Sequence, residues 1–240
     1  MDVIMIRLDK YLADMGVGTR SEVKKYIKQG KISVDGQVVK SADMKVEIET
    51  QLVTFQGQRV GYEEFEYYML HKPAGVVSAT TDAKDKTVID LITDKKRKDL
   101  FPVGRLDKDT EGLLLITNDG DMAHRLLAPK KHVDKVYYAR IDGRVTEEDV
   151  LAFQEGISIG QGEVAKPAKL EILKADEISE IHVTIQEGKF HQVKRMFEAV
   201  NNKVVYLKRI SMGNMKLDET LSLGDYRKLT LEEIEYLKSL

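Results

Sequence analysis

The chain contains no cysteine, and its longest uninterrupted aliphatic run is only Leu113 to Ile116. The lack of cysteine excludes disulfide bonds, thiolate metal sites and a cysteine nucleophile. The aliphatic run is far shorter than the roughly 20 apolar residues that cross a bilayer. The first ten residues also lack the apolar block of a secretory signal. We therefore expect a cytoplasmic protein with no membrane partner.

No strong net charge of either sign is present, because the total is −2 over 240 residues. This average hides an uneven distribution. Residues 1–61 hold ten basic and eight acidic side chains, net +2, whereas the remaining 179 residues hold 28 and 32, net −4. Local charge density, and not the total, sets the field that a polyanion meets. The overall charge therefore does not exclude a nucleic-acid partner.

The first 61 residues are patterned as two short helices followed by a small sheet. Apolar residues from Leu8 to Met15 recur at the spacing of a helix with one buried side. A second helix is expected to begin at Thr19, which can form a capping box with Glu22, and to end at Gly30. Asp35-Gly36 lies between two β-like runs, which predicts a tight hairpin.

One side of the second predicted helix and its end is strongly basic. Only one acidic residue accompanies five basic ones, which are Arg20, Lys24, Lys25, Lys28 and Lys31. A compact unit with a one-sided cationic face suits binding to an RNA phosphate backbone. The alternative is an ordinary solvated helix face.

Beyond the acidic stretch 62–66, the pattern changes to strands interspersed with a few helices. We expect strands at 67–70, 75–79, 112–117, 135–141, 168–173, 180–186 and over most of 204–229, and helices at 87–92, 121–127, 146–154, 190–200 and 231–240. This is an α+β pattern. We therefore expect a first domain at 1–61, a linker at 62–66 and a second domain at 67–240.

Residues 104–120, GRLDKDTEGLLLITNDG, are the most informative segment of the chain. They indicate a charged loop that runs into a buried strand. Asp107 and Asp109 in this loop allow three interpretations: solvated turn carboxylates, a pair that binds Mg²⁺, or a carboxylate nucleophile held ionised by a nearby cation. Spacing alone does not decide between them. The five histidines lack metal-ligand spacing, and we expect no metal.

Four blocks resemble the pseudouridine synthases that act on ribosomal RNA. They are Gly104-Arg-Leu-Asp107-x-Asp-Thr-x-Gly-Leu-Leu, Leu70-His-Lys-Pro-Ala-Gly75, Lys135-Val-Tyr137 and Glu187-Gly-Lys-Phe-His-Gln-Val-Lys-Arg-Met-Phe197. The chain length and the last block are most similar to the ribosomal small-subunit pseudouridine synthase A family. Residues 5–60 resemble the alpha-L RNA-binding domain, named from a small-subunit ribosomal protein. The resemblance implies a helix-helix-hairpin domain followed by a catalytic domain with a mixed, mostly antiparallel sheet.

The resemblance also implies roles for individual residues. Asp107 would be the catalytic carboxylate, Lys194 would pair with it, and Tyr137 would stack on the target uracil unless it is simply a core aromatic. Arg105 would enter the RNA helix in place of the displaced base. The helix at 190–200 carries Phe190, Val193 and Phe197 on one stripe, which we assign to the core. The basic side chains Lys189, His191 and Arg195 are then left to face the cleft or the RNA.

The implied reaction isomerises one uridine of 16S rRNA, at the uridine-516 equivalent. The C1′–N1 bond breaks, the uracil turns while held, and a C1′–C5 bond forms, without a cofactor. Asp107 either adds to the nucleotide or assists by abstracting a proton at C2′, and the sequence does not separate these routes. The expected partner of this monomer is 16S rRNA or an assembly intermediate of the small subunit.

Three other functions are considered. A large-subunit (23S) rRNA target is compatible with the same motifs. A non-catalytic RNA-binding factor in ribosome assembly would need neither Asp107 nor Lys194. A magnesium-dependent hydrolase would use Asp107 with Asp109, and its activity would be lost in EDTA.

Overall fold

The computed structural model describes residues 4–128 and 131–240, which form two compact units. The first unit comprises the chain up to Glu66 together with Thr93–Leu100, and the second comprises Tyr67–Ile92 and Phe101–Leu240. One boundary between the two units falls after Glu66, so residues 62–66 lie within the first unit. The segment 93–100, which sequence patterning assigned to the second domain, belongs to the first unit.

Specific polar contacts hold segment 93–100 in the first unit. The Glu66 carboxylate accepts hydrogen bonds from the backbone amides of Lys96 and Arg97. The buried Arg97 guanidinium lies 3.4 Å from Asp14. Residues 62–66 also lie in this unit, where the ring of Tyr62 packs 4.9 Å from that of Tyr11. Contacts between residues so far apart produce no periodic pattern in the sequence, so the sequence did not predict them.

The first unit contains the two helices and the hairpin that its sequence predicts. Its elements are β1 (Met5–Arg7), α1 (Leu8–Asp14), α2 (Arg20–Lys28), β2 (Ile32–Val34), β3 (Gln37–Val38), β4 (Lys45–Glu47), β5 (Val53–Phe55) and β6 (Gln58–Arg59). Four strands form a sheet in the order β3-β2-β5-β6, while β1 pairs with β4. The capping box of Thr19 and Glu22 is present. Val23 and Ile27 of α2 are buried, so its charged side faces solvent.

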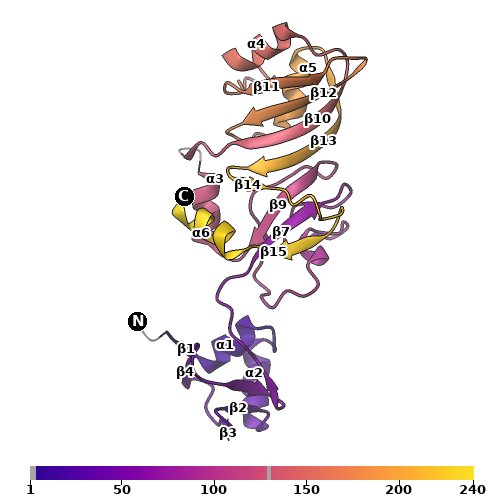
Figure 1. Ribbon diagram of the computed structural model, residues 1–240. Coiled ribbons are helices and arrows are strands. Elements are labelled where there is room, and N and C mark those ends of the chain that lie inside the picture. The colour runs from indigo at the N-terminus through magenta and orange to yellow at the C-terminus, as the bar shows by residue number, and fades with distance from the viewer. Residues whose placement is uncertain (1–3, 129–130) are drawn as a thin grey trace. The chain divides into compact units, whose positions relative to one another are not determined.

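The second unit is built on one mixed, mostly antiparallel sheet (Figure 1). Its elements are β7 (Tyr67–Lys72), the 3₁₀ turn η1 (Ile89–Leu91), β8 (Phe101–Pro102), β9 (Glu111–Thr117), α3 (Gly120–Leu127), β10 (Lys135–Asp142), α4 (Glu147–Glu155), β11 (Lys169–Lys174), β12 (Ile178–Ile185), α5 (Gln192–Ala199), β13 (Lys203–Met212), β14 (Met215–Lys216), β15 (Tyr226–Lys228) and α6 (Leu231–Ser239). The strand order is β11-β12-β10-β13-β9-β7-β15.

The sheet consists of two halves that meet between β13 and β9. This junction is short and parallel, with Lys208 opposite Glu111 and Arg209 opposite Gly112, whereas the other ladders of this sheet are antiparallel. At Gly112, which has φ +108°, an added Cβ atom would lie 2.2 Å from the backbone oxygen of Arg209. Only glycine allows the two backbones to approach so closely.

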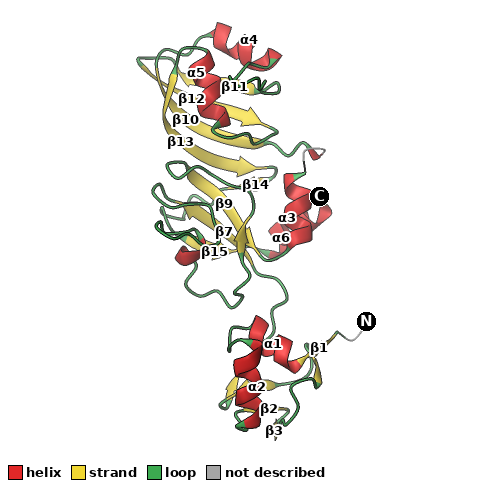
Figure 2. Ribbon diagram, turned by 180° about the vertical axis from the view of Figure 1, so that it is seen from behind, coloured by secondary structure: helices red, strands yellow, loops and turns green. Residues whose placement is uncertain are grey.

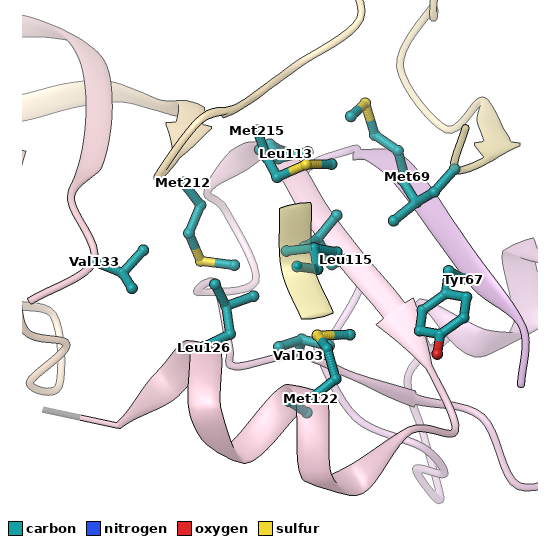
Figure 3. Close-up of a cluster of buried hydrophobic side chains, with 13 residues drawn as sticks. Tyr67, Met69, Val103, Leu113, Leu115, Met122, Leu126, Val133, Met212 and Met215 are labelled. Carbon is teal, nitrogen blue, oxygen red and sulfur yellow. The ribbon is translucent and has the colours of Figure 1, made fainter. Parts of the chain in front are cut away.

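Helices cover the two halves separately. Helices α4 and α5 pack against the half formed by β11, β12, β10 and β13, as Figure 2 shows. Helices α3 and α6 lie beside each other next to the other half. Figure 3 shows the core beside α3, where Met122 and Leu126 belong to one buried cluster with side chains from β7 and β9, including Met69 and Leu115. The charged loop at 104–110 thus runs into the buried strand β9, as predicted.

Three expected elements differ from the structure. Segment 75–79 is not a strand: it makes one isolated bridge, Val77 to Thr87, and its polar groups bond to the turn at 104–110. The helix expected at 87–92 is only the 3₁₀ turn η1. Strands occupy only part of 204–229, in β13, β14 and β15. No helix among residues 4–128 and 131–240 is long and apolar enough to span a bilayer.

We predict that Gly112→Ala lowers the free energy of unfolding by about 3 kcal/mol or more, because the methyl group collides with the Arg209 backbone. Gly224→Ala is the matched control, since Gly224 also has a positive φ, +91°, but open space around it. It should cost only about 1–2 kcal/mol. Urea unfolding of both variants checks this, and equal losses would contradict the crowding argument.

Candidate active site

A cleft of about 1070 Å³ opens in the second unit beside the β9–β13 junction. It is lined by parts of three loops, 74–79, 104–109 and 186–191, together with Tyr137, Lys194 and Arg209. Residues from both halves of the sheet therefore share one cavity. The sequence blocks that carry the family resemblance converge here, although they are separated by up to about a hundred residues.

Lys194, in the first turn of α5, lies between the two aspartates of the 104–110 turn. Its Nζ is 3.3 Å from Oδ2 of Asp107. It also donates hydrogen bonds of 2.7 and 2.9 Å to the two oxygens of Asp109. The side chain of Asp107 is 27% exposed, and that of Asp109 is 71% exposed. An ammonium group thus occupies the place between the carboxylates, which favours the nucleophile interpretation over a Mg²⁺ pair.

The charged groups of this cluster shift the pKa values of Lys194 and Asp109. Burial disfavours the charge of Lys194, but the hydrogen bond to Asp109 and the charges of both aspartates outweigh it and raise the pKa of the amine. The hydrogen bond from Lys194 lowers the pKa of Asp109 below its ordinary value. Lys194 and Asp109 therefore stay oppositely charged over the neutral pH range.

His191 contributes a third group to the cluster. Its Nε2 lies 3.7 Å from Oδ1 of Asp107. The residue precedes α5 with a left-handed backbone, φ +49°. This conformation turns the chain abruptly at the start of the helix, so the ring reaches the cleft.

Lys72 binds the backbone of the turn that carries Asp107. Sequence patterning did not assign this residue to the site. Its side chain is completely buried. Its Nζ donates to the carbonyl oxygens of Pro73, Asp107, Lys108 and Thr110, at 2.9–3.3 Å. Burial lowers its pKa to about 8, against the opposing charges of Asp109, Asp107 and Glu111. The sequence feature that could have identified Lys72 is its place in the block Leu70-His-Lys-Pro-Ala-Gly75, which resembles the family.

Segment 74–79 supports the same turn. The backbone amide of Gly75 donates to the carbonyl of Lys108 at 2.8 Å. The Ser78 hydroxyl donates to the carbonyl of Leu106, and the amide of Leu106 donates back to that hydroxyl. The backbone around Asp107 is therefore fixed on several sides before any substrate arrives.

Comparison with known proteins agrees with this geometry. The family model "RNA pseudouridylate synthase" matches residues 66–199, and the "S4 domain" model matches residues 6–52. The chain belongs to the RNA pseudouridylate synthase family. It is therefore an isomerase of the pseudouridine synthase class, with an N-terminal RNA-binding domain of the S4, or alpha-L, type.

Individual relatives are similar over nearly the whole chain. An RNA pseudouridine synthase of Bacillus subtilis, YtzG, is 50% identical over 97% of this chain and 98% of its own. The ribosomal small subunit pseudouridine synthase A of Vibrio cholerae is 42% identical over 95% and 98%. The ribosomal large subunit pseudouridine synthase B of B. subtilis is 40% identical over 98% and 97%. A crystal structure of a pseudouridylate synthase, 40% identical, aligns with TM-score 0.68 over 97% of this chain and 99% of the other.

Within this pseudouridine synthase domain, the other residues expected at the site are distributed as follows. Tyr137 of β10 is 7% exposed and lines the cleft. Arg105 is exposed at the cleft rim. Two buried cations, Lys135 and Arg209, also line the cleft. Tyr137 and Arg209 lie opposite each other in the β10–β13 ladder, so their side chains share one face of the sheet.

Two basic residues expected to face the RNA are already engaged within the protein. The guanidinium of Arg195 donates to the carbonyls of Ile159, Gly160 and Phe190 and pairs with Glu163 at 2.6 Å. Arg195 thereby ties loop 156–163 to α5. The amine of Lys189 donates to the carbonyl of Val164. RNA contact by these two side chains stays a prediction.

The basic residues expected to bind RNA in the first unit lie mainly on α2. Arg20, Lys24, Lys25 and Lys28 are exposed. Lys31, just after the helix, places its Nζ 5.6 Å from the centre of the Tyr26 ring, a cation–π contact. The first unit thus presents a cationic helix face opposite its core.

No group of three or more His, Asp or Glu side chains in the described part of the chain is arranged to hold a metal ion. The expectation that the enzyme uses no metal and no cofactor stays a prediction.

We predict that Lys72→Met lowers kcat by about tenfold or more, because the carbonyls that face the ammonium group lose their shared donor and the turn of Asp107 loosens. The matched control is Lys108→Met, since Lys108 lies in the same turn but is half-exposed and paired with Asp85. That variant should keep kcat within about twofold. Single-turnover assays on RNA separate the two, with thermal unfolding to show that both proteins are folded. Unchanged kcat in the Lys72 variant would contradict a positioning role.

Proposed function

We propose that the protein converts a specific uridine of 16S rRNA to pseudouridine, with Asp107 as the catalytic carboxylate. The observation that carries this proposal is the ammonium group of Lys194, 3.3 Å from Asp107 in a cleft that also contains Tyr137. A carboxylate acts as a nucleophile or base through its charged oxygens, and an adjacent ammonium group orients them.

The cleft has a volume that suits one flipped nucleotide. Small-ligand sites are typically about 300–1000 Å³, and this one is about 1070 Å³. A uridine within a stacked RNA segment must leave its stack to reach Asp107, at a cost of a few kcal/mol. Arg105, exposed at the rim, is suited to fill the gap that the base leaves, and Tyr137 is suited to stack on the uracil.

The reaction then needs no external reactant. The C1′–N1 bond breaks with its electron pair left on N1, the uracil turns while it is held in the cleft, and C5 bonds to C1′. C5 then loses its proton to a base and N1 gains one, so the product is an isomer of the substrate. Asp107 serves either by adding to the nucleotide or by abstracting a proton at C2′. The positive charge of Lys194 supports both routes, because it orients the same carboxylate oxygens.

The 16S target is the preferred assignment. Among the relatives above, one named for the small subunit and one named for the large subunit have similar identities, 42% and 40%. The sequence of the block at 187–197, which contains His191, is most similar to the small-subunit family. A 23S target is therefore the second candidate. The proposed setting is a cytoplasmic monomer that acts on 16S rRNA or on a small-subunit assembly intermediate.

We predict that Asp107→Asn reduces pseudouridine formation by at least about 1000-fold, because the amide cannot supply the negative oxygen that the reaction needs. RNA affinity should stay within about twofold. Asp121→Asn, the same change on an exposed carboxylate of α3, should keep full activity. Turnover retained in the Asp107 variant would refute the assignment.

Mapping of pseudouridines in rRNA from cells with and without the protein identifies the target. Loss of one 16S pseudouridine is the expected result. Loss of a 23S pseudouridine would favour the second candidate, and intact modification of both rRNAs would favour a non-catalytic assembly factor. Activity that is abolished by EDTA would instead support metal chemistry at Asp107 and Asp109.

We also predict that the exposed face of α2 contributes to RNA affinity. The double variant Lys24→Gln/Lys28→Gln should weaken RNA binding and reduce the salt slope of the affinity by about 1.4–1.8, since each phosphate contact accounts for about 0.7–0.9. Lys40→Gln/Lys45→Gln, which removes two exposed lysines outside α2, is the control. Binding titrations at several salt concentrations measure both slopes. Equal changes in the two variants would show that α2 has no special role.

A further inference from the structure

Phe190 departs from its expected position in the core. It is 70% exposed, the highest value among the six phenylalanines, whereas Phe197 on the same predicted stripe is fully buried. Helix α5 begins only at Gln192, and His191 before it has a left-handed backbone. This turn interrupts the helical periodicity, so that Phe190 lies at the wall of the cleft and not under the helix.

The ring of Phe190 is stacked on the ring of His191. Their centres are 3.8 Å apart and their planes differ by 17°. On its Nε2 side, His191 reaches to 3.7 Å from Asp107. The two stacked rings (the Phe190–His191 pair) therefore line the cleft next to Asp107, and the side chain of Phe190 is largely exposed.

The backbone under this pair is held in place. The carbonyl of Phe190 accepts a hydrogen bond from Arg195. The amide of Lys189 donates to the Gln192 side chain at 2.9 Å, and the amide of Gln192 donates to the carbonyl of Lys189. Because this backbone is already ordered, little conformational entropy is lost when a ligand binds, and the free-energy cost of binding is lower.

We propose that the Phe190–His191 pair is a stacking platform for the base of a nucleotide adjacent to the target uridine. The proposal rests on the function proposed above. Every base has an apolar face that stacks on an aromatic ring, and larger faces stack more strongly. Arg105 is an exposed cation in the same cleft and is available to the phosphates of the same strand.

A single tryptophan tests the stacking directly, because the chain has none of its own. Phe190→Trp is made in the Asp107→Asn background, which blocks turnover, and is titrated with in vitro transcribed 16S rRNA. Stacking of a base should quench the indole emission strongly and saturably. Leu151→Trp on α4, where the native side chain is 59% exposed, controls for absorption and non-specific quenching. Equal quenching at both positions would overturn the proposal.

Activity provides the second measurement. Phe190→Leu keeps an apolar side chain but removes the ring, and it should raise KM about 5- to 150-fold with a smaller effect on kcat. This range corresponds to about 1–3 kcal/mol at 1.4 kcal/mol per tenfold. Phe190→Tyr keeps the ring and should have a KM near the wild-type value, and a KM raised as much as in Phe190→Leu would contradict a stacking role.

The two proposals fail in different ways. If the wild-type protein makes no pseudouridine in rRNA, the proposed function fails, whatever the fluorescence shows. If the wild-type protein is active but Phe190→Leu has an unchanged KM, the platform proposal fails and the function stands.

Discussion

The close approach of β9 and β13 at Gly112 is the constraint on which the active site depends. The parallel contact there is two residues long, and an added Cβ atom would overlap the backbone of Arg209. Asp107 and Lys72 come from one half of the sheet, and Tyr137 comes from the other, against which the helix that carries Lys194 packs. If the two halves separated, the carboxylate and its cation would no longer meet.

Two lysines, Lys72 and Lys194, set the position and the charged surroundings of the Asp107 carboxylate. Lys72 acts through the backbone, because its buried ammonium group holds the carbonyls of the turn and not the carboxylate itself. Lys194 acts on the side chain and divides its hydrogen-bonding capacity between Asp107 and Asp109. The two lysines thus have separate tasks, one positioning the turn and one balancing its charge. A buried lysine is costly to keep protonated, as its lowered pKa reflects, so its placement beneath four carbonyls has a clear electrostatic reason.

The two units suit a division between holding RNA and modifying it. The first unit presents exposed lysines on α2 over a small apolar core. The second unit has a large cleft whose wall carries both cations and an exposed aromatic pair. The slightly negative net charge of the chain hides both features, because RNA responds to local fields within about 8 Å at physiological salt.

Local patterns in the sequence were sufficient for much of this protein. The capping box of α2 and the buried strand after Asp107 are present as expected. They depend on neighbouring residues or on contiguous motifs. The tertiary structure alone decided the burial of Lys72, the internal bonding of Arg195, the exposure of Phe190 and the place of segment 93–100. Each of these depends on a long-range contact, or on one left-handed residue that breaks a helical stripe, and neither has a periodic signature along the chain.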